Sequence, residues 1–383
     1  MRSPTSVTRR HMLRSATALG AAACLASVGS PSAIEAHPEQ PYDLAHFSPR
    51  LKELRDRLHV KIRDWVMRGR LARADGYLYT IDAAQLLVYF ARVGDAEAYT
   101  ALRAHAQKNL IHDDRDDPYT KGFVSWRWKS AEKPDASGTT EALRVARGLW
   151  IGAKTFNRPA DADLALSVLD GYARHGGIDQ GMWMIRNYFS FGTRSFAPNS
   201  FLVDYDPDFI HEVATEQKSA PLSKLADQCY AVIKMAVAPS DLLYDIIQPE
   251  VATLYPELNL KAFSPNDVIQ LSNCCATAMT VAGGIPAIPR KVLAFALTRF
   301  SDLRAYYVGR TGEPYNGKSA AVSEYSVLAR LAAKLNADLP AATIADRAMQ
   351  DWIWSVDHAQ EMGVFAASEI LLAMQALLDL CRA

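Results

Sequence analysis

The sequence predicts an all-α protein, because apolar residues recur at helical spacing and no segment sustains the alternation of a strand. This spacing runs through residues 51–65, 84–91, 143–150 and 328–335. The first turn of a helix favours an oxygen acceptor or a proline, so we expect helices to start at Ser48-Pro49, Asp95, Thr139, Pro159, Ser264-Pro265 and Ser301-Asp302. Polar loops over 112–122, 133–138, 171–207 and 309–317 are expected to bind a ligand.

Residues 1–36 are typical of an export signal and are left out of the predicted fold. Arg9-Arg10 precede a small apolar run from Ala16 to Val28, the order found in twin-arginine signals. A chance arginine pair and a lipoprotein signal at Cys24 are the alternatives. We therefore expect a periplasmic or secreted protein, exported by the twin-arginine route, with one mature domain over residues 37–383.

Composition excludes several classes of partner. The 42 basic and 42 acidic residues cancel, so the chain offers no strong field for nucleic acid or anionic lipid. No apolar stretch after the signal approaches the roughly 18 residues that span a bilayer, so no membrane contact is expected once the signal is removed. The remaining four cysteines have no zinc-site spacing and are expected to pack in the core, with a single disulfide as the alternative. No cofactor motif is present, and we expect neither a cofactor nor a metal.

Short motifs follow one another in a characteristic order between Gly76 and Leu335. They are Tyr79-Thr80-Ile81-Asp82, Ser125-Trp126-Arg127-Trp128, Ser137-Gly138-Thr139-Thr140-Glu141-Ala142-Leu143, Asn199-Ser200-Phe201 and Asn266-Asp267-Val268-Ile269. In this order they resemble the motifs of glycoside hydrolase family 8, most closely those of periplasmic cellulases that accompany bacterial cellulose synthases. The resemblance implies a single (α/α)6 toroid of paired helices, where periodicity alone also allows a helical solenoid. The chain departs from the family at its general-acid glutamate, which an ungapped match would place at Ile81.

Three carboxylates are candidate catalytic residues. Glycoside hydrolysis needs one protonated carboxyl group for the leaving oxygen and one ionised group to activate water. The resemblance implies Asp82 as the acid, Asp267 as the base and Glu141 or Asp135 as a carboxylate that orients the substrate. From the residues alone, Asp82 is as well explained as a helix cap, Asp267 as a first-turn acid and Glu141 as part of a capping box.

Sugar-binding side chains are expected in the polar loops, because sugars stack on aromatic rings and bond to acidic, amide and guanidinium groups. The candidates are Tyr79, Trp126, Trp128, Asp135, Arg186, Tyr188, Asn199, Asp204, Tyr205 and Asp206. Asp241 and Tyr244 could extend this wall, whereas Trp150 lies in an apolar helix stripe and is expected in the core. The acids between Asp204 and Asp208 lack the glycine and terminal glutamate of a calcium hand.

Together with the export signal, the resemblance implies an exported, endo-acting hydrolase that cleaves a β-1,4-linked polysaccharide such as cellulose with inversion. Its expected partner is a polysaccharide or oligosaccharide substrate, and a polysaccharide-synthesis complex is a further candidate. The alternative is a catalytically degenerate toroid that binds polysaccharide during synthesis or export. A third hypothesis keeps the fold but uses acids between Asp204 and Asp208 on a different glycan.

Overall fold

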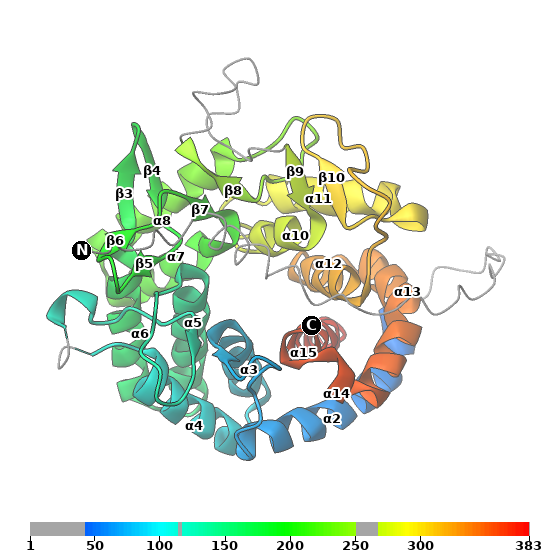
Figure 1. The fold of residues 1–383 in the computed structure, drawn as a ribbon. Helices are drawn as coiled ribbons and strands as arrows, with labels where there is room; N and C mark the ends of the chain where they lie inside the picture. The colour runs from blue at the N-terminus through cyan, green and yellow to red at the C-terminus, as the bar shows by residue number, and fades with distance from the viewer. Residues whose placement is uncertain (1–42, 114–116, 250–266, 383) are drawn as a thin grey trace, which may run out of the picture.

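Two rings of helices, one inside the other, make up the protein in this computed structural model, which describes residues 43–113, 117–249 and 267–382 (Figure 1). The inner ring consists of α3 (Thr80–Val93), α5 (Thr139–Thr155), the short turn η4 (Leu202–Asp204) with α7 (Pro207–Gln217), α10 (Leu271–Met279), α12 (Val322–Lys334) and α15 (Val364–Leu380). The outer ring consists of α2 (Leu44–Met67), α4 (Ala96–His105), α6 (Pro159–Ala173), α8 (Ala220–Met235), α11 (Ala287–Thr298) and α13 (Asp338–Asp357). The predicted all-α toroid is confirmed.

The ring closes because its last helices return to its first. Helix α15 packs against α12 on one side and α3 on the other, and α13 packs on α2. Inner and outer helices alternate along the chain, so consecutive helices form antiparallel pairs. A solenoid would leave its two ends apart, whereas here residues 44–93 and 338–380 share one core.

The two rings differ in how much of each helix is buried. Outer helix α2 buries a single stripe: Leu44, Phe47, Leu51, Leu54, Leu58, Ile62 and Val66. Inner helices α3 and α15 are buried on nearly every side, because they contact both the outer ring and the ring interior. None of the helices in the described part of the chain is long and apolar enough to cross a bilayer.

The observed helix starts agree with the predicted ones where a nearby capping residue sets the first turn. Helices α4, α5 and α6 begin at or next to the predicted Asp95, Thr139 and Pro159. The start predicted at Ser48-Pro49 is wrong, because the Asp43 carboxylate already caps α2 by accepting a hydrogen bond from the amide of Ala45 at 3.0 Å.

Two other predicted starts have different outcomes. Ser301-Asp302 lies in a short 3-10 turn, η6 (Phe300–Asp302), where an α-helix was expected, and the chain continues into strand β10. The start predicted at Ser264-Pro265 falls outside the described residues. A polar residue beside an apolar run therefore marks the boundary of a structural element, but that element is not always a helix.

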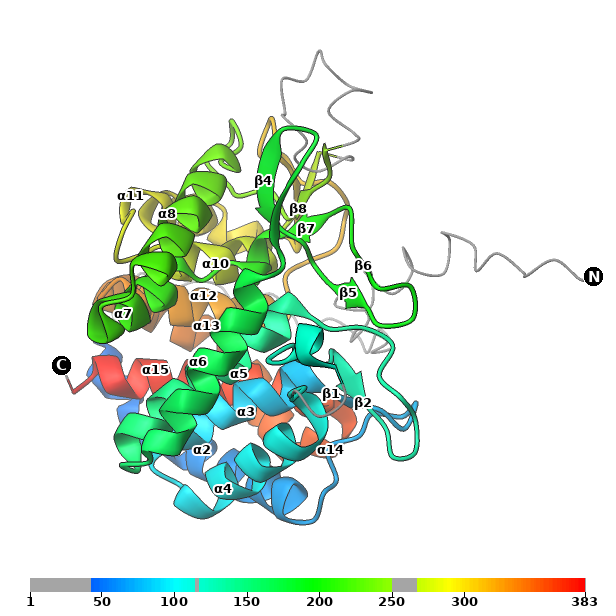
Figure 2. The same ribbon diagram turned by 90° about the vertical axis from the view of Figure 1, so that its left-hand side faces the viewer.

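Short antiparallel strands stiffen the loops between helices. The pairs are β1 (Leu78–Tyr79) with β2 (Arg127–Trp128), β3 (Gly176–Asp179) with β4 (Met182–Ile185), β5 (Phe189–Ser190) with β6 (Ser195–Phe196), β7 (Ser200–Phe201) with β8 (Ile246–Ile247), and β9 (Val268–Gln270) with β10 (Tyr306–Val308). Figure 2 shows these loops gathered on one side of the ring, with the carboxyl terminus on the other. We call the side on which the inner helices α3, α5, α10, α12 and α15 begin the loop face.

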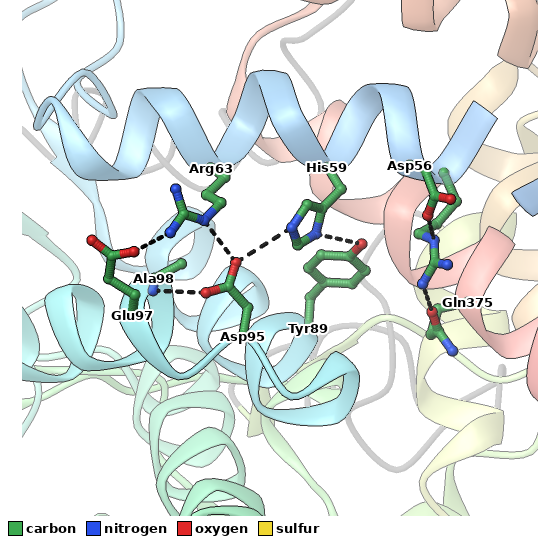
Figure 3. A network of polar contacts seen from close by, with 9 residues as sticks. Asp56, His59, Arg63, Tyr89, Asp95, Glu97, Ala98 and Gln375 are labelled. Atoms are coloured by element: carbon green, nitrogen blue, oxygen red, sulfur yellow. Dashed lines mark hydrogen bonds and ion pairs between the residues drawn. The ribbon is translucent and has the colours of Figure 1, made fainter. Parts of the chain in front are cut away.

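A polar network links α2 to α3 and to the start of α4 (Figure 3). The His59 imidazole lies between two partners, with Nε2 3.3 Å from Oδ2 of Asp95 and Nδ1 3.1 Å from the hydroxyl of Tyr89. Arg63 Nε donates to the same Asp95 oxygen at 3.0 Å. Since Asp95 also caps α4 through the amide of Ala98, one carboxylate links α2 to the start of α4.

Candidate active site

The candidate carboxylates lie at the starts of inner-ring segments on the loop face. Asp82 and Glu141 are the third residues of α3 and α5, two inner helices that pack against each other. Asp204 ends η4, which packs between α5 and α10. Asp267 directly precedes β9, which leads into α10. The toroid therefore places Asp82, Glu141 and Asp204 close enough for their charges to interact, and it puts Asp267, 185 positions after Asp82, at an inner-ring segment on the same face.

Asp82 is fully buried and paired with Arg73. Arg73 donates from Nε to Oδ2 at 2.8 Å and from Nη2 to Oδ1 at 2.7 Å, so both carboxylate oxygens are occupied. Burial raises the pKa of Asp82, and the Arg73 guanidinium opposes that shift. The residue in the cap position of α3 is Tyr79, so the helix-cap interpretation of Asp82 is wrong. A carboxylate with no exposed surface and two bonds to a guanidinium is poorly placed to give a proton to a substrate.

Tyr79 and Trp126 form an aromatic wall beside this pair. The Arg73 guanidinium lies 4.0 Å from the centre of the Tyr79 ring, and the Tyr79 and Trp126 rings meet edge to face at 5.6 Å. Trp126 Nε1 donates to Oδ1 of Asp135 at 2.7 Å, which fixes the indole. Both rings are half-buried, as a sugar-binding surface requires. Trp128 instead packs edge-on against His105 at 5.0 Å and contributes to the core.

Glu141 is half-buried and carries the most informative carboxyl group of the site. The cap of α5 is Gly138, whose amide donates to the carbonyl of Val124 at 2.8 Å, so the predicted capping box does not form. Among the described residues, no other side chain donates a hydrogen bond to the Glu141 carboxyl. Burial, assisted by the negative charges of Asp204 and Asp82, raises the pKa of Glu141 to about 7.

Asp204 is a buried neighbour that shapes the surroundings of Glu141. It accepts hydrogen bonds from the Thr140 hydroxyl and, at 3.2 Å, from the amide of Phe201. Burial raises the pKa of Asp204 to about 7. Since both oxygens bond to protein groups, Asp204 joins η4 to the start of α5 and lies beside Glu141 without facing a substrate. Its predicted substrate contact is not supported by this position.

Asp267 is held from several sides. The Tyr244 hydroxyl donates to Oδ1 at 3.0 Å, and Arg310 Nε donates to Oδ2 at 2.9 Å. The backbone of Asp267 has a φ of 51°, an unusual left-handed conformation for a residue other than glycine, and its carbonyl accepts from the amide of Gly309 at 2.8 Å. Burial raises the pKa of Tyr244, so its hydroxyl remains a donor. The motif residue Asn266 lies outside the described residues.

Asp245 is a candidate that the sequence analysis missed. Its Oδ2 accepts from the amide of Gln270 at 2.7 Å, while its buried Oδ1 has no hydrogen-bond partner among the described residues. Burial raises the pKa of Asp245 to about 8. The signal in the sequence is an acid directly before the apolar pair Ile246-Ile247, which form strand β8. An unpaired buried carboxyl near a loop face is a feature of functional sites.

Two expected substrate-binding residues have structural roles instead. Tyr205 is fully buried, and its hydroxyl lies 2.9 Å from the amide of Ile185 and 3.0 Å from Oγ of Ser200. Asp206 caps α7 and pairs with Arg147 at 2.9 Å, in a cavity at the other end of the ring. Both side chains therefore have partners within the protein and lie away from the loop face, because the polarity of a loop does not reveal which way each side chain points.

The remaining candidates lie around strands β4 to β7. Arg186, Tyr188 and Asn199 are half-buried, and Asp135 is exposed. The Arg186 guanidinium lies 5.3 Å from the centre of the Phe196 ring. These positions leave substrate contact open to Arg186, Tyr188 and Asn199. No cluster of three or more His, Cys, Asp or Glu residues in the described part of the chain could hold a metal ion.

Comparison with known proteins shows which solved structures share this fold. No protein-family model and no curated protein sequence matches the chain. Solved structures do: the endo-β-1,4-glucanase CMCax from Acetobacter xylinum matches with a TM-score of 0.59 over 85% of this chain and 98% of its own, at 12% identity. The endoglucanase Cel10 from Klebsiella pneumoniae, a family 8 glycosyl hydrolase, matches with a TM-score of 0.53 over 76% and 97%, at 12% identity. The chain thus shares the (α/α)6 toroid fold of these glycoside hydrolases.

The family 8 fold alone does not fix the substrate. An α-amylase from Clostridium perfringens matches with a TM-score of 0.64 over 80% of this chain and 90% of its own, at 12% identity. Similar folds thus occur in proteins named for different glycosidic linkages. At such low identity the likeness concerns the fold, and the chemistry of this toroid must be argued from its own residues.

Proposed function

We propose that this protein is a glycoside hydrolase that cleaves a β-linked polysaccharide with inversion, using Glu141 as the general acid and Asp267 as the base. The observation that carries the proposal is the Glu141 carboxyl, which is half-buried, lacks a side-chain partner among the described residues and has a pKa raised to about 7. A carboxyl with such a pKa is protonated in a useful fraction near neutral pH, as a proton donor must be.

The reaction needs the two carboxyls to act on opposite sides of the anomeric carbon. Glu141 gives its proton to the glycosidic oxygen as the bond from that oxygen to the anomeric carbon breaks. Asp267 accepts a proton from a water molecule, whose oxygen forms the new bond. The two residues belong to different inner-ring segments, with η4 packed between α5 and α10. An inverting mechanism requires a separation of roughly 6.5–9.5 Å between the two carboxyls, which leaves room for the water.

Asp82 has a positioning role in this proposal, in place of the acid role that the family resemblance implies. Its negative charge contributes to the raised pKa of Glu141, and Arg73 keeps the carboxylate in one place. The acid function thus moves from α3, where Ile81 stands at the expected position, to the neighbouring helix α5. With the acid on α5, the motif at the start of α3 can contribute Tyr79 and Asp82 to the site without the glutamate that the family has there.

A β-1,4-linked glucan is the proposed substrate, endo-cleaved along the loop face. The Tyr79 and Trp126 rings offer a half-buried surface on which the flat faces of β-linked glucose units can stack. CMCax, which shares the fold, is named for action on this linkage. An α-linked glucan is the competing substrate, because the amylase match has a similar fold.

Release of reducing ends from a panel of polysaccharides tests the proposal. The panel contains a soluble β-1,4-glucan, a mixed-linkage β-glucan, xylan and starch. We expect release from a β-linked member and a loss of at least about 100-fold in Glu141→Gln and Asp267→Asn. Glu216→Gln is the control, because Glu216 is exposed on α7 and pairs only with surface Lys154.

Two other outcomes separate the competing functions. Release from starch alone would assign an α-linked substrate to the same site. Binding of oligosaccharides without release from any member would favour the polysaccharide-binding toroid. Either result contradicts the β-glucan hydrolase proposed here.

Export is proposed from the sequence of residues 1–36, which lie outside the described residues. Replacing Arg9-Arg10 by two lysines should retain the protein in the cytoplasm if the twin-arginine route carries it. Unchanged export of the double variant would contradict this route. Association with a polysaccharide-synthesis complex is a further proposal that rests on the family resemblance alone.

A further inference from the structure

A cavity of about 370 Å³ opens into the ring from the end opposite the loop face. It is lined by residues near the carboxyl ends of inner helices α3, α10, α12 and α15, together with part of α5 and the segment after η4. Figure 2 shows the carboxyl end of α15 on this side, away from the strands. Its volume is in the range of cavities that hold small molecules. The catalytic residues proposed above do not line it.

Basic side chains dominate the lining of this cavity. They are Arg92, Arg144, Arg147, Arg330 and Lys334, against the two acids Asp206 and Asp379. This imbalance contrasts with the even balance of acids and bases in the whole chain. Guanidinium groups donate in a planar fork that matches the oxygens of phosphate and carboxylate groups.

Protein carboxylates pair with only some of these arginines. Arg147 pairs with Asp206 at 2.9 Å, and Arg330 pairs with Glu369 behind the cavity wall. Within the described residues, neither Arg92 nor Arg144 makes a hydrogen bond or ion pair with another residue. Two guanidinium groups in one cavity thus remain available to a ligand.

Helix dipoles explain only part of the arrangement. Arg92 and Lys334 lie in the last turns of α3 and α12, where the partial negative charge of a helix end stabilises a cation. Arg144 and Arg147 lie in the first half of α5, where no such stabilisation exists. The unpaired Arg144 in particular lacks a structural explanation.

Like charges lie close together in this cavity, and the charges of Arg147 and Arg330 act on Arg92. Desolvation at the cavity wall lowers the pKa of Arg92 to about 10, although the residue is partly open to solvent, and the charges of Arg147 and Arg330 act in the same direction. Burial likewise lowers the pKa of Arg144. An anion placed between the arginines would relieve this repulsion and occupy their donors.

We propose that the cavity binds a small oxyanion, a phosphate or carboxylate group carried by a small molecule, between Arg92 and Arg144. The site shares helix α5 with Glu141, whose pKa the Arg144 charge lowers, but its residues line the opposite cavity and its binding test does not depend on the hydrolytic function. The remaining volume of about 370 Å³ leaves room for a body of sugar size attached to the anionic group.

Calorimetric titration of the purified protein tests the proposal with inorganic phosphate, glucose 6-phosphate and glucuronate, all at constant ionic strength. We expect saturable binding of at least one of the three. Preference for glucose 6-phosphate over phosphate identifies a phosphorylated molecule, whereas preference for glucuronate identifies a carboxylated one. Saturable heat from none of them overturns the proposal.

Variants locate the site. Arg92→Gln and Arg144→Gln should each weaken binding about tenfold or more, since each removes a charged hydrogen-bond donor. Arg290→Gln, on the exposed surface of α11, should leave binding unchanged. Asp267→Asn should also leave it unchanged, and loss of binding in this variant would place the ligand on the loop face and contradict the proposal.

Thermal unfolding without ligand separates binding from a structural role. Because neither arginine makes a hydrogen bond or ion pair with another described residue, and Arg147 and Arg330 repel Arg92, replacing either arginine should leave the melting temperature nearly unchanged. A fall of more than about 5 °C in both variants would show that the arginines stabilise the fold and would contradict a site built for a ligand.

Discussion

Arg73 binds Asp82 through two parallel hydrogen bonds, from Nε at 2.8 Å and from Nη2 at 2.7 Å. The carboxylate is fully buried, and the guanidinium also lies over the ring of Tyr79. The pair thus ties the loop before α3 to the inner ring and supports the aromatic wall of the site. Asp82 is thus a buried charge that a substitution of Arg73 would leave without its guanidinium partner.

Removing Arg73 should destabilise the protein strongly. In Arg73→Gln the buried Asp82 loses its charged partner, which costs about 3–5 kcal/mol in comparable pairs. Urea unfolding followed by circular dichroism measures the free energy of unfolding. Arg68→Gln, which breaks an exposed pair with Asp64, is the control and should cost less than about 1 kcal/mol. Equal small losses in both variants would contradict the structural role of the buried pair.

The rate of hydrolysis should fall as the pH rises through about 7. Burial and two neighbouring carboxylates raise the pKa of Glu141 to about 7, and an acid catalyst is active only while protonated. The alkaline limb of the kcat/KM profile should therefore lie near this pH. In Glu141→Gln the remaining rate should lose this limb, and an unchanged limb in the variant would assign it to another group.

Gly309 should be required for full activity although it has no proposed contact with the substrate. A β-carbon there would overlap the Tyr244 ring and lie 2.8 Å from Oδ1 of Asp267. Gly309→Ala should lower kcat at least about tenfold with little change in KM, because the base is displaced from its working position. Gly317→Ala is the matched control, since its β-carbon would meet open space. Equal activity of the two variants would contradict the proposed role of Asp267.

The His59 network should contribute to loss of stability in acid. Burial lowers the pKa of His59 below its usual 6.5, although the Asp95 charge opposes the shift. A group with a lowered native pKa is stabilising above its unfolded pKa, and that contribution is lost as the pH falls below about 6.5. Urea unfolding at pH 7.5 and pH 5 should show a smaller loss for His59→Gln than for the wild-type protein. The same loss in both proteins would mean that His59 does not contribute.

The fold was predictable from the sequence where local patterns decide it. Helical periodicity and the caps at Asp95 and Pro159 depend on residues close together in the chain, and these predictions are confirmed. The start at Ser48-Pro49 failed because Asp43, further upstream, caps first. Helical pattern alone also could not separate a closed ring from a solenoid, since closure depends on contacts between α15 and α3.

The site was less predictable because its chemistry arises between elements. The pKa of Glu141 depends on α3, α5 and η4 meeting, so no motif on one helix could reveal it. Tyr205 and Asp206 share the polar loop of the other candidates, yet both are buried and lie at the cavity opposite the loop face. Asp245 was missed because its environment comes from Gln270, which is 25 residues away.

The most direct test of the account compares two substrates of Glu141→Gln. One is a β-1,4-glucan, whose leaving group needs a proton, and the other is an aryl β-oligoglucoside whose phenolate leaves without one. If Glu141 is the general acid, the variant loses at least about 100-fold in kcat/KM on the glucan and retains near wild-type activity on the aryl substrate. Equal losses on both substrates would contradict this role and would mean that another carboxyl group is the general acid.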